Sequence, residues 1–249
     1  MNDILYAEWI KLKRSKALTI GLSGSYIVPV FVLFNSIQRY MKNPNEIIDL
    51  FGLYDGAIMF LMLLFAPLVM AVTATYIISR EYTEQTLKTI LTVPVSRKKF
   101  LAGKFCILFL VVMLFMFISW FHILILAMLC SIFVKVAQIT ILSAAFFLLK
   151  MLFGAVLLYM TLTPVVYLSI RNKGFIAPFI ASAAVCLLNV VLSGSKIAGY
   201  IPWCASYLLV NGHGRSLGCP PYVSFFIIAG VCLLSIIASM KRFLREDIF

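Results

Sequence analysis

Long stretches without a charged side chain alternate with short polar segments along most of this chain. Six of these stretches are long enough to cross about 30 Å of hydrocarbon as a helix that rises about 1.5 Å per residue. The spans we expect are residues 17–36, 56–79, 105–134, 151–170, 174–192 and 222–240. The pattern therefore predicts an all-α integral membrane protein with six transmembrane helices in one domain, residues 1–249.

Three segments outside these spans are also apolar in part. Residues 1–16 carry apolar side chains at helical spacing beside basic ones, which predicts an amphipathic helix on the membrane surface. Residues 139–149 would make a 32-residue helix if joined to the fourth span, so we expect a separate interfacial segment and a span that begins near Lys150. Residues 194–220 form an outer loop, and Gly199 and Pro202 break its apolar part, as in a re-entrant or surface-lying helix.

Composition and charge agree with a membrane protein and indicate its orientation. The chain is 63% hydrophobic and 12% charged, with a net charge of +12. If the N-terminus is cytoplasmic, 15 of the 21 Lys and Arg residues fall in the inside segments and 5 in the outside ones. This asymmetry is typical of membrane orientation rather than of nucleic-acid binding, and it predicts that both termini are cytoplasmic.

The most informative polar segment is the elbow of residues 81–99, between the second and third spans. Glu81 to Leu91 are expected to form a short helix, Pro94 to end it, and Ser96 to cap the helix of the third span. A rod held at both ends by spans can pass a force into the membrane. The alternative is that these are ordinary interfacial residues that follow the topology.

Five fragments of this region resemble the first cytoplasmic loop of ABC-2 type permeases. They are Ser79-Arg80-Glu81, Gln85-Thr86-Leu87, Leu91, Pro94-Val95-Ser96-Arg97 and Lys104, with Gln85 where many members carry Gly. The layout of the whole chain is similar to the small permeases of lantibiotic and bacitracin immunity. The resemblance implies that the elbow is a coupling helix seated on an ATP-binding subunit. The residues it implies for ATPase coupling are Glu81, Thr83, Thr86, Leu87, Pro94, Ser96 and Arg97.

The resemblance also implies a function, partners and a location. The chain would be the permease subunit of an exporter in a bacterial plasma membrane, removing a hydrophobic or amphipathic peptide antibiotic. It would act with two ATP-binding subunits and a second permease subunit, as a homodimer or a heterodimer. The sequence lacks a glycine-rich phosphate loop that ends in Gly-Lys-Ser or Gly-Lys-Thr, so no cofactor is expected on this chain, and ATP and magnesium would bind the partner. Two alternatives stay open: export of a small drug, lipid or ion, and a membrane anchor or regulator without transport.

Polar groups within apolar helices are costly and are therefore candidates for a substrate path. Lys150, His122 and Asn189 are the three candidates, although each has a structural explanation as an interfacial cation, a packing histidine or an interhelical hydrogen-bonding group. His122 has no Cys or carboxylate at ligand spacing, so no metal site is expected. Cys204 and Cys219 share the outer loop, and spacing does not decide whether they pair.

The outer loop also contains a serine and a histidine, the residue types of a hydrolase. Ser195 and His213 faintly resemble the pair of an intramembrane serine protease, but both fall in one outer loop without a third partner. The sequence therefore disfavours a protease.

Overall fold

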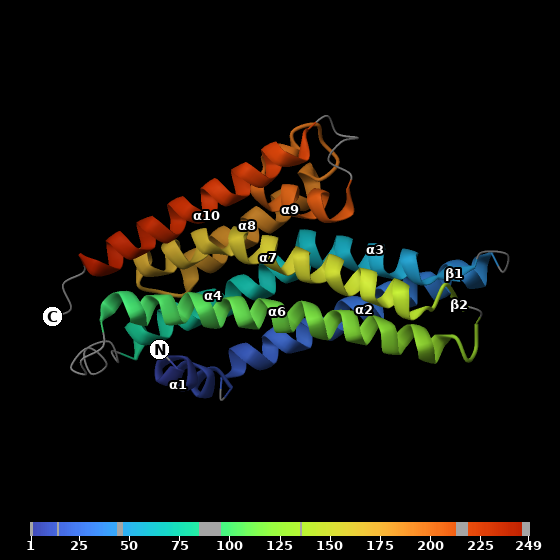
Figure 1. Ribbon diagram of the computed structural model, residues 1–249, viewed down its shortest axis with the longest axis horizontal. Coiled ribbons are helices and arrows are strands. Elements are labelled where there is room, and N and C mark those ends of the chain that lie inside the picture. The colour runs from blue at the N-terminus through green and yellow to red at the C-terminus, as the bar shows by residue number, and fades with distance from the viewer. Residues whose placement is uncertain are drawn as a thin grey trace.

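The long helices of this protein lie side by side along one axis in the computed structural model (Figure 1). The structure describes residues 2–13, 15–43, 47–84, 96–134, 136–212 and 219–245. Helix α1 and the C-terminal end of α10 lie at one end of the bundle, together with the ends of α4 and α6 that flank residues 85–95. The opposite end carries the short strands β1 and β2.

Helices account for nearly all of the regular structure, which confirms the predicted all-α membrane fold. The helices are α1 (Asn2–Lys13), α2 (Lys16–Lys42), α3 (Leu50–Phe60), the π-helical turn η1 (Leu61–Phe65), α4 (Ala66–Thr83), α6 (Arg97–Cys130), α7 (Ile141–Asn172), α8 (Ile176–Leu192), the 3₁₀ turn η2 (Ala198–Tyr200), α9 (Pro202–Asn211) and α10 (Pro221–Leu244). A two-residue parallel ladder joins β1 (Ile48–Asp49) to β2 (Val136–Ala137).

Five helices are long and apolar enough to cross a membrane within the described residues: Leu18–Lys42, Leu50–Thr83, Arg97–Cys130, Ile141–Asn172 and Pro221–Leu244. The fifth predicted span corresponds to α8, which is apolar but has only 17 residues. Several helices extend beyond the predicted spans, because the hydropathy pattern marks only the charge-free part of each helix.

The expected break before Lys150 does not occur. Residues Ile141–Asn172 form one helix of 32 residues, and a reciprocal pair of hydrogen bonds between Thr140 and Ser143 caps its start. The ammonium group of Lys150 is paired with Asp55 of α3 at 2.6 Å. The charge is therefore accommodated within the helix, and the chain does not need to break before it. The apolar residues before it also pack, since the ring of Phe147 stacks on Tyr54 at 4.5 Å.

The elbow is also shorter at its start than the sequence suggested. Residues Glu81 to Thr83 continue α4 and end the helix of the second span, rather than opening a new helix. Upstream, the π-helical turn η1 precedes Pro67, which lies in the first turn of α4. A proline has no N–H to continue the α-helical ladder, and a π turn is one way to pass it within a continuous helix.

Helix α7 forms the centre of the bundle and contacts α4, α6, α8, α9 and α10. Helix α2 packs on α6 and α4, while α1 is seen nearly end-on in Figure 1 and crosses the bundle axis beside α6. The orientation of α1 is the one expected of a helix at a membrane surface.

The outer segment before the last span folds back onto the bundle. Its helix α9 contacts both α7 and α10, with Cys204, Leu208 and Val210 buried. Cys204 and Cys219 are free thiols in the structure. Gly199 approaches Cys219 so closely that a Cβ atom on Gly199 would lie 2.4 Å from the Cβ atom of Cys219.

This close approach gives a first prediction. Gly199→Ala should lower the apparent melting temperature of the detergent-purified protein, because overpacking costs about 1–3 kcal/mol and each kcal/mol shifts the melting temperature by roughly 2–4 °C. Gly230→Ala is the matched control, since a Cβ at that position of α10 meets nothing within 4 Å. Equal melting temperatures for the two variants would contradict the packing of this segment on α10.

Candidate functional site

The two helices that flank the elbow end in well-defined positions. Helix α4 ends at Thr83, and α6 begins at Arg97 after Ser96. The Ser96 hydroxyl accepts a hydrogen bond from the backbone N–H of Lys99 at 3.4 Å, which confirms Ser96 as the N-cap of this helix. The two legs of the elbow are therefore fixed by the spans that they continue.

A buried ion pair joins these two legs. The Lys104 ammonium of α6 lies 3.2 Å from the Glu81 carboxylate of α4, and each side chain is only 3% exposed. The same ammonium donates to the carbonyl oxygen of Ile77 at 2.8 Å, one turn earlier in α4. Lys104 is therefore bonded to two successive turns of α4.

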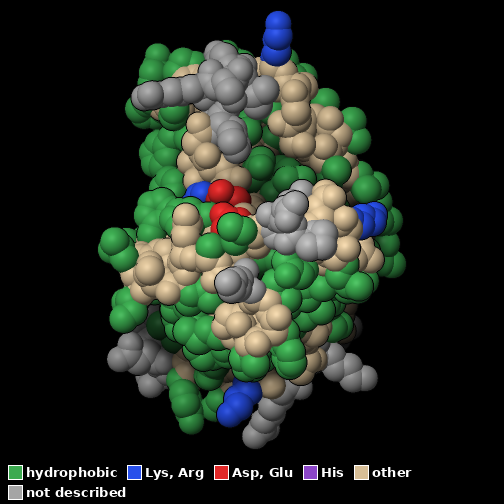
Figure 2. All heavy atoms as spheres, turned by 90° about the vertical axis from the view of Figure 1, so that its right-hand side faces the viewer, with side chains coloured by type: hydrophobic (Ala, Val, Ile, Leu, Met, Phe, Trp, Pro, Cys, Tyr) green, Lys and Arg blue, Asp and Glu red, His purple; other side chains and the backbone are tan. Residues whose placement is uncertain are grey.

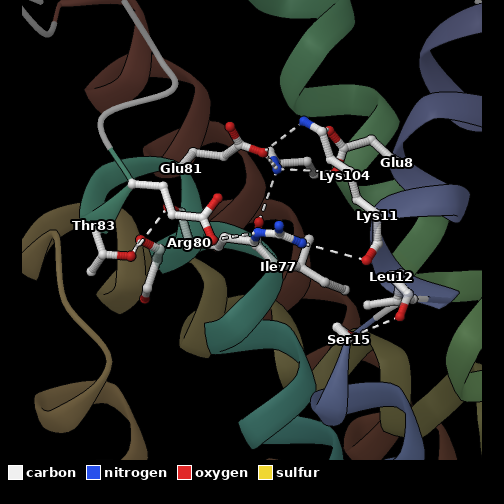
Figure 3. A network of polar contacts seen from close by, with 11 residues as sticks. Glu8, Lys11, Leu12, Ser15, Ile77, Arg80, Glu81, Thr83 and Lys104 are labelled. Carbon is white, nitrogen blue, oxygen red and sulfur yellow. Dashed lines mark hydrogen bonds and ion pairs between the residues drawn. The ribbon is translucent and has the colours of Figure 1, made fainter.

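Helix α1 adds a second pair of opposite charges to this site. Glu8 accepts from Lys104 at 3.2 Å, and Lys11 donates to Glu81 at 3.1 Å and lies 3.4 Å from Glu8. We call Glu8, Lys11, Glu81 and Lys104 the ionic cluster; Figure 3 shows its side chains pointing toward one another from three helices. Burial opposes the charged form of Lys11, but the two carboxylates outweigh burial and raise its pKa.

The ionic cluster is electrically balanced, with two carboxylates and two ammonium groups. Such a group is costly to bury, so it contributes orientation rather than a large net gain in stability. Removing one member leaves an uncompensated buried charge, which typically costs about 3–5 kcal/mol. The arrangement therefore fixes how α1, α4 and α6 meet.

Further polar contacts surround the ionic cluster at the same end of the bundle. Arg80 donates to the carbonyl oxygen of Lys11 at 3.4 Å and pairs with Glu84 at 2.9 Å. The Ser79 hydroxyl donates to the carbonyl oxygen of Gly174 at 3.0 Å, in the turn between α7 and α8. The end of α4 is thus bonded to α1 and to the next inner turn of the chain.

The described residues expected to take part in coupling differ in their surroundings. Glu81 is buried in the ionic cluster, whereas Thr83 and Ser96 lie near the surface. Arg97 donates to the carbonyl oxygen of Leu244, at the end of α10, at 3.5 Å. Glu81 is thus held between three helices, and Arg97 contacts the end of α10. Thr86, Leu87 and Pro94 lie outside the described residues.

Sequence reasoning missed Glu8 and Lys11 and assigned Lys104 only to the topology and to the loop pattern. One signal was present for Glu8. It falls between Leu5 and Leu12 at helical spacing, so a carboxylate lies on the apolar face of the amphipathic helix. A charge at such a position predicts a buried partner of opposite sign.

The three candidates for a substrate path are held apart on α6, α7 and α8. The Lys150 ammonium pairs with Asp55 and lies 5.4 Å from the ring centre of Phe147. His122 Nδ1 lies 2.8 Å from the carbonyl oxygen of Ile118, and the imidazole meets the ring of Tyr26 edge to face. Both contacts are of the kind that anchors a side chain within the bundle.

Asn189 differs because it has an unused hydrogen-bond donor. Its amide oxygen accepts from the Cys204 thiol at 3.4 Å, linking α8 to α9. Its amide nitrogen is buried and has no hydrogen-bond partner among the described residues. One turn earlier on α8, a small apolar cavity of about 80 Å³ lies between α4, α7, α8 and α9, lined by residues that include Pro67, Pro164 and Trp203.

Ser195 of the disfavoured protease pair donates its hydroxyl to the carbonyl oxygen of Leu192 at 2.7 Å. This is a local turn contact. His213 lies outside the described residues.

Comparison with known proteins identifies the family. Residues 4–209 match the family described as ABC-2 family transporter protein. The bacitracin transport permease protein BCRB of Bacillus licheniformis is 25% identical over 215 residues, which are 85% of this chain and 100% of that protein. Together with the multi-pass helical bundle, the family match shows that this chain belongs to the ABC-2 transporter family, as a permease subunit that works with an ATP-binding subunit.

Proposed function

We propose that this permease subunit exports a hydrophobic or amphipathic peptide antibiotic from a bacterial plasma membrane, using ATP hydrolysed by its partner. The single observation that carries the coupling part of this proposal is the buried Glu81–Lys104 ion pair between the two legs of the elbow. Because the legs are bonded to each other, a push on the loop moves α4 and α6 as one body.

The assembly that we propose has two permease subunits and two ATP-binding subunits. The end of the bundle with α1, the elbow and the C-terminal end of α10 would face the cytoplasm, in line with the excess of basic residues there. ATP and magnesium would bind the partner subunits. Thr83, Thr86, Leu87, Pro94, Ser96 and Arg97 are the residues that we propose for contact with a partner. Glu81 would position them from within the ionic cluster.

For the cargo, the similarity to a protein named for bacitracin transport supports a peptide antibiotic. The apolar cavity beside α8 would take an apolar part of such a molecule, and the free amide donor of Asn189 would bond a peptide carbonyl once α8 and α9 separate. Lys150 and His122 would border the path from anchored positions.

The coupling proposal predicts the effect of removing one charge. In the complex with its ATP-binding subunit, Glu81→Gln should abolish most of the substrate-stimulated ATP hydrolysis, because Lys104 loses its α4 carboxylate. Glu84→Gln is the matched control, since Glu84 is a half-exposed partner of Arg80 on the same helix turn and such pairs contribute only about 0.3–0.5 kcal/mol.

Two measurements distinguish a loss of force transmission from a loss of binding to the ATP-binding subunit. Glu81→Gln should still insert in the membrane and co-purify with the ATP-binding subunit, because its side chain is buried. Leu87→Asp, which places a charge on a residue that we propose for contact with the partner, should lose co-purification. Stimulated hydrolysis in Glu81→Gln at the level of Glu84→Gln would contradict the coupling role.

The cargo proposal predicts a pattern of protection. Cells that express the permease with its ATP-binding subunit should grow at several-fold higher concentrations of cyclic peptide antibiotics or lantibiotics than cells with a hydrolysis-deficient ATP-binding subunit. Small hydrophobic drugs should show no such difference. Protection only against small drugs would point to another cargo, and no protection at all would favour an anchor or regulator.

A further inference from the structure

A polar hollow lies at the end of the bundle opposite α1 and the ionic cluster. It is bounded by the last two turns of α2, by β1 and by the first turn of α3, and its cavity volume is about 90 Å³. Its lining residues are Ser36, Arg39, Tyr40, Ile47, Ile48, Asp49, Gly52 and Leu53. This volume is below that of a drug-sized site, roughly 300–1,000 Å³, so the hollow has room for a small polar group rather than for a whole small molecule.

Arg39 and Asp49, which carry opposite charges, both line this hollow. Within the described parts of the chain, no hydrogen bond or ion pair engages the side chain of Arg39 or of Asp49. The two groups are also not within ion-pairing distance of each other, although both face the same space. Figure 2 looks at this end of the molecule, where few charged side chains are visible among the hydrophobic ones.

The backbone of Asp49 is held in place, but its carboxylate does not cap the helix that follows. Asp49 is fixed by the β1–β2 ladder, where it lies opposite Ala137, and it immediately precedes α3. An aspartate at this position usually accepts from the first N–H groups of the helix, but Asp49 makes no such bond. Its carboxylate lies over Gly52 instead, where a Cβ atom would come within 2.7 Å of the carboxylate oxygen Oδ1.

The position of the hollow along the membrane-spanning helix α2 indicates which ligand it can bind. Arg39 and Tyr40 lie near the end of the apolar helix Leu18–Lys42, where a membrane-spanning helix reaches the lipid headgroups. Arginine pairs well with phosphate oxygens, and a carboxylate pairs with an ammonium group. A ligand that carries both groups side by side would satisfy both unpaired charges at once.

We propose that this hollow binds the zwitterionic headgroup of a phospholipid with a primary ammonium group, its phosphate on Arg39 and its ammonium on Asp49. Gly52 leaves the space that the carboxylate occupies. The site is independent of the coupling proposal, since it lies at the other end of the bundle.

The test is lipid binding to the purified full-length protein in detergent, measured by native mass spectrometry. Phosphatidylethanolamine is the probe, with phosphatidylglycerol as the lipid that lacks the ammonium group. Arg39→Gln and Asp49→Asn should each weaken phosphatidylethanolamine binding by about 10- to 100-fold, the loss of one charge-assisted hydrogen bond. Lys42→Gln is the matched control, because Lys42 shares the last turn of α2 but does not line the hollow.

Further variants and probes show which chemical group of the lipid each residue binds. Asp49→Asn should leave phosphatidylglycerol binding unchanged, and Gly52→Ala, which keeps both charges but displaces the carboxylate, should weaken phosphatidylethanolamine alone. Equal binding of the two lipids by the unaltered protein, or unchanged binding in Arg39→Gln, would overturn the proposal. If free phosphoethanolamine bound as tightly as the lipid, the proposal of a lipid site would be overturned in favour of a site for a soluble ligand. Displacement of the lipid by a peptide antibiotic in an Arg39-dependent manner would overturn it in favour of a cargo site.

Discussion

Glu81 and Lys104 meet where water does not reach them, on two helices that a polar loop connects. Each group alone would be too costly to keep charged in this position, so each requires the other. The pairing fixes the distance between the inner ends of α4 and α6, and with it the base of the elbow. The position of α1 follows from the same interaction, because Glu8 and Lys11 complete the charge balance around it. In the coupling that we propose, α1 therefore belongs to the body that the elbow would move.

The two ends of the bundle use charge in different ways. At the end with α1, opposite charges are buried and matched, which gives a rigid joint between three helices. At the other end, Lys150 and the half-exposed Asp55 link α7 to α3, while Arg39 and Asp49 have no ion-pair partner among the described residues beside an open hollow. Matched buried charges suit the transmission of a force, whereas unmatched charges near the lipid headgroups suit the binding of a ligand.

Much of the fold could be predicted from the hydropathy pattern, because membrane spans are defined by long charge-free stretches. The cap at Ser96 could be predicted too, since it depends on a few neighbouring residues. The pairing of Lys150 with Asp55 could not, because the two are 95 positions apart and only packing brings them together. The partners of Lys104 could not be predicted either, because in the sequence its charge indicates only which side of the membrane the segment lies on. Glu8 was the exception, since a carboxylate on an apolar helix face already implies a buried partner, although not which one.

The most direct measurement is a double-mutant cycle on Glu81→Gln and Lys104→Met, read as the ratio of substrate-stimulated to basal ATP hydrolysis in the assembled transporter. If the ion pair passes the force between the legs of the elbow, the double variant should lose no more stimulation than either single variant. Losses that simply add, in free-energy terms, would show that the two residues act separately and would contradict the account.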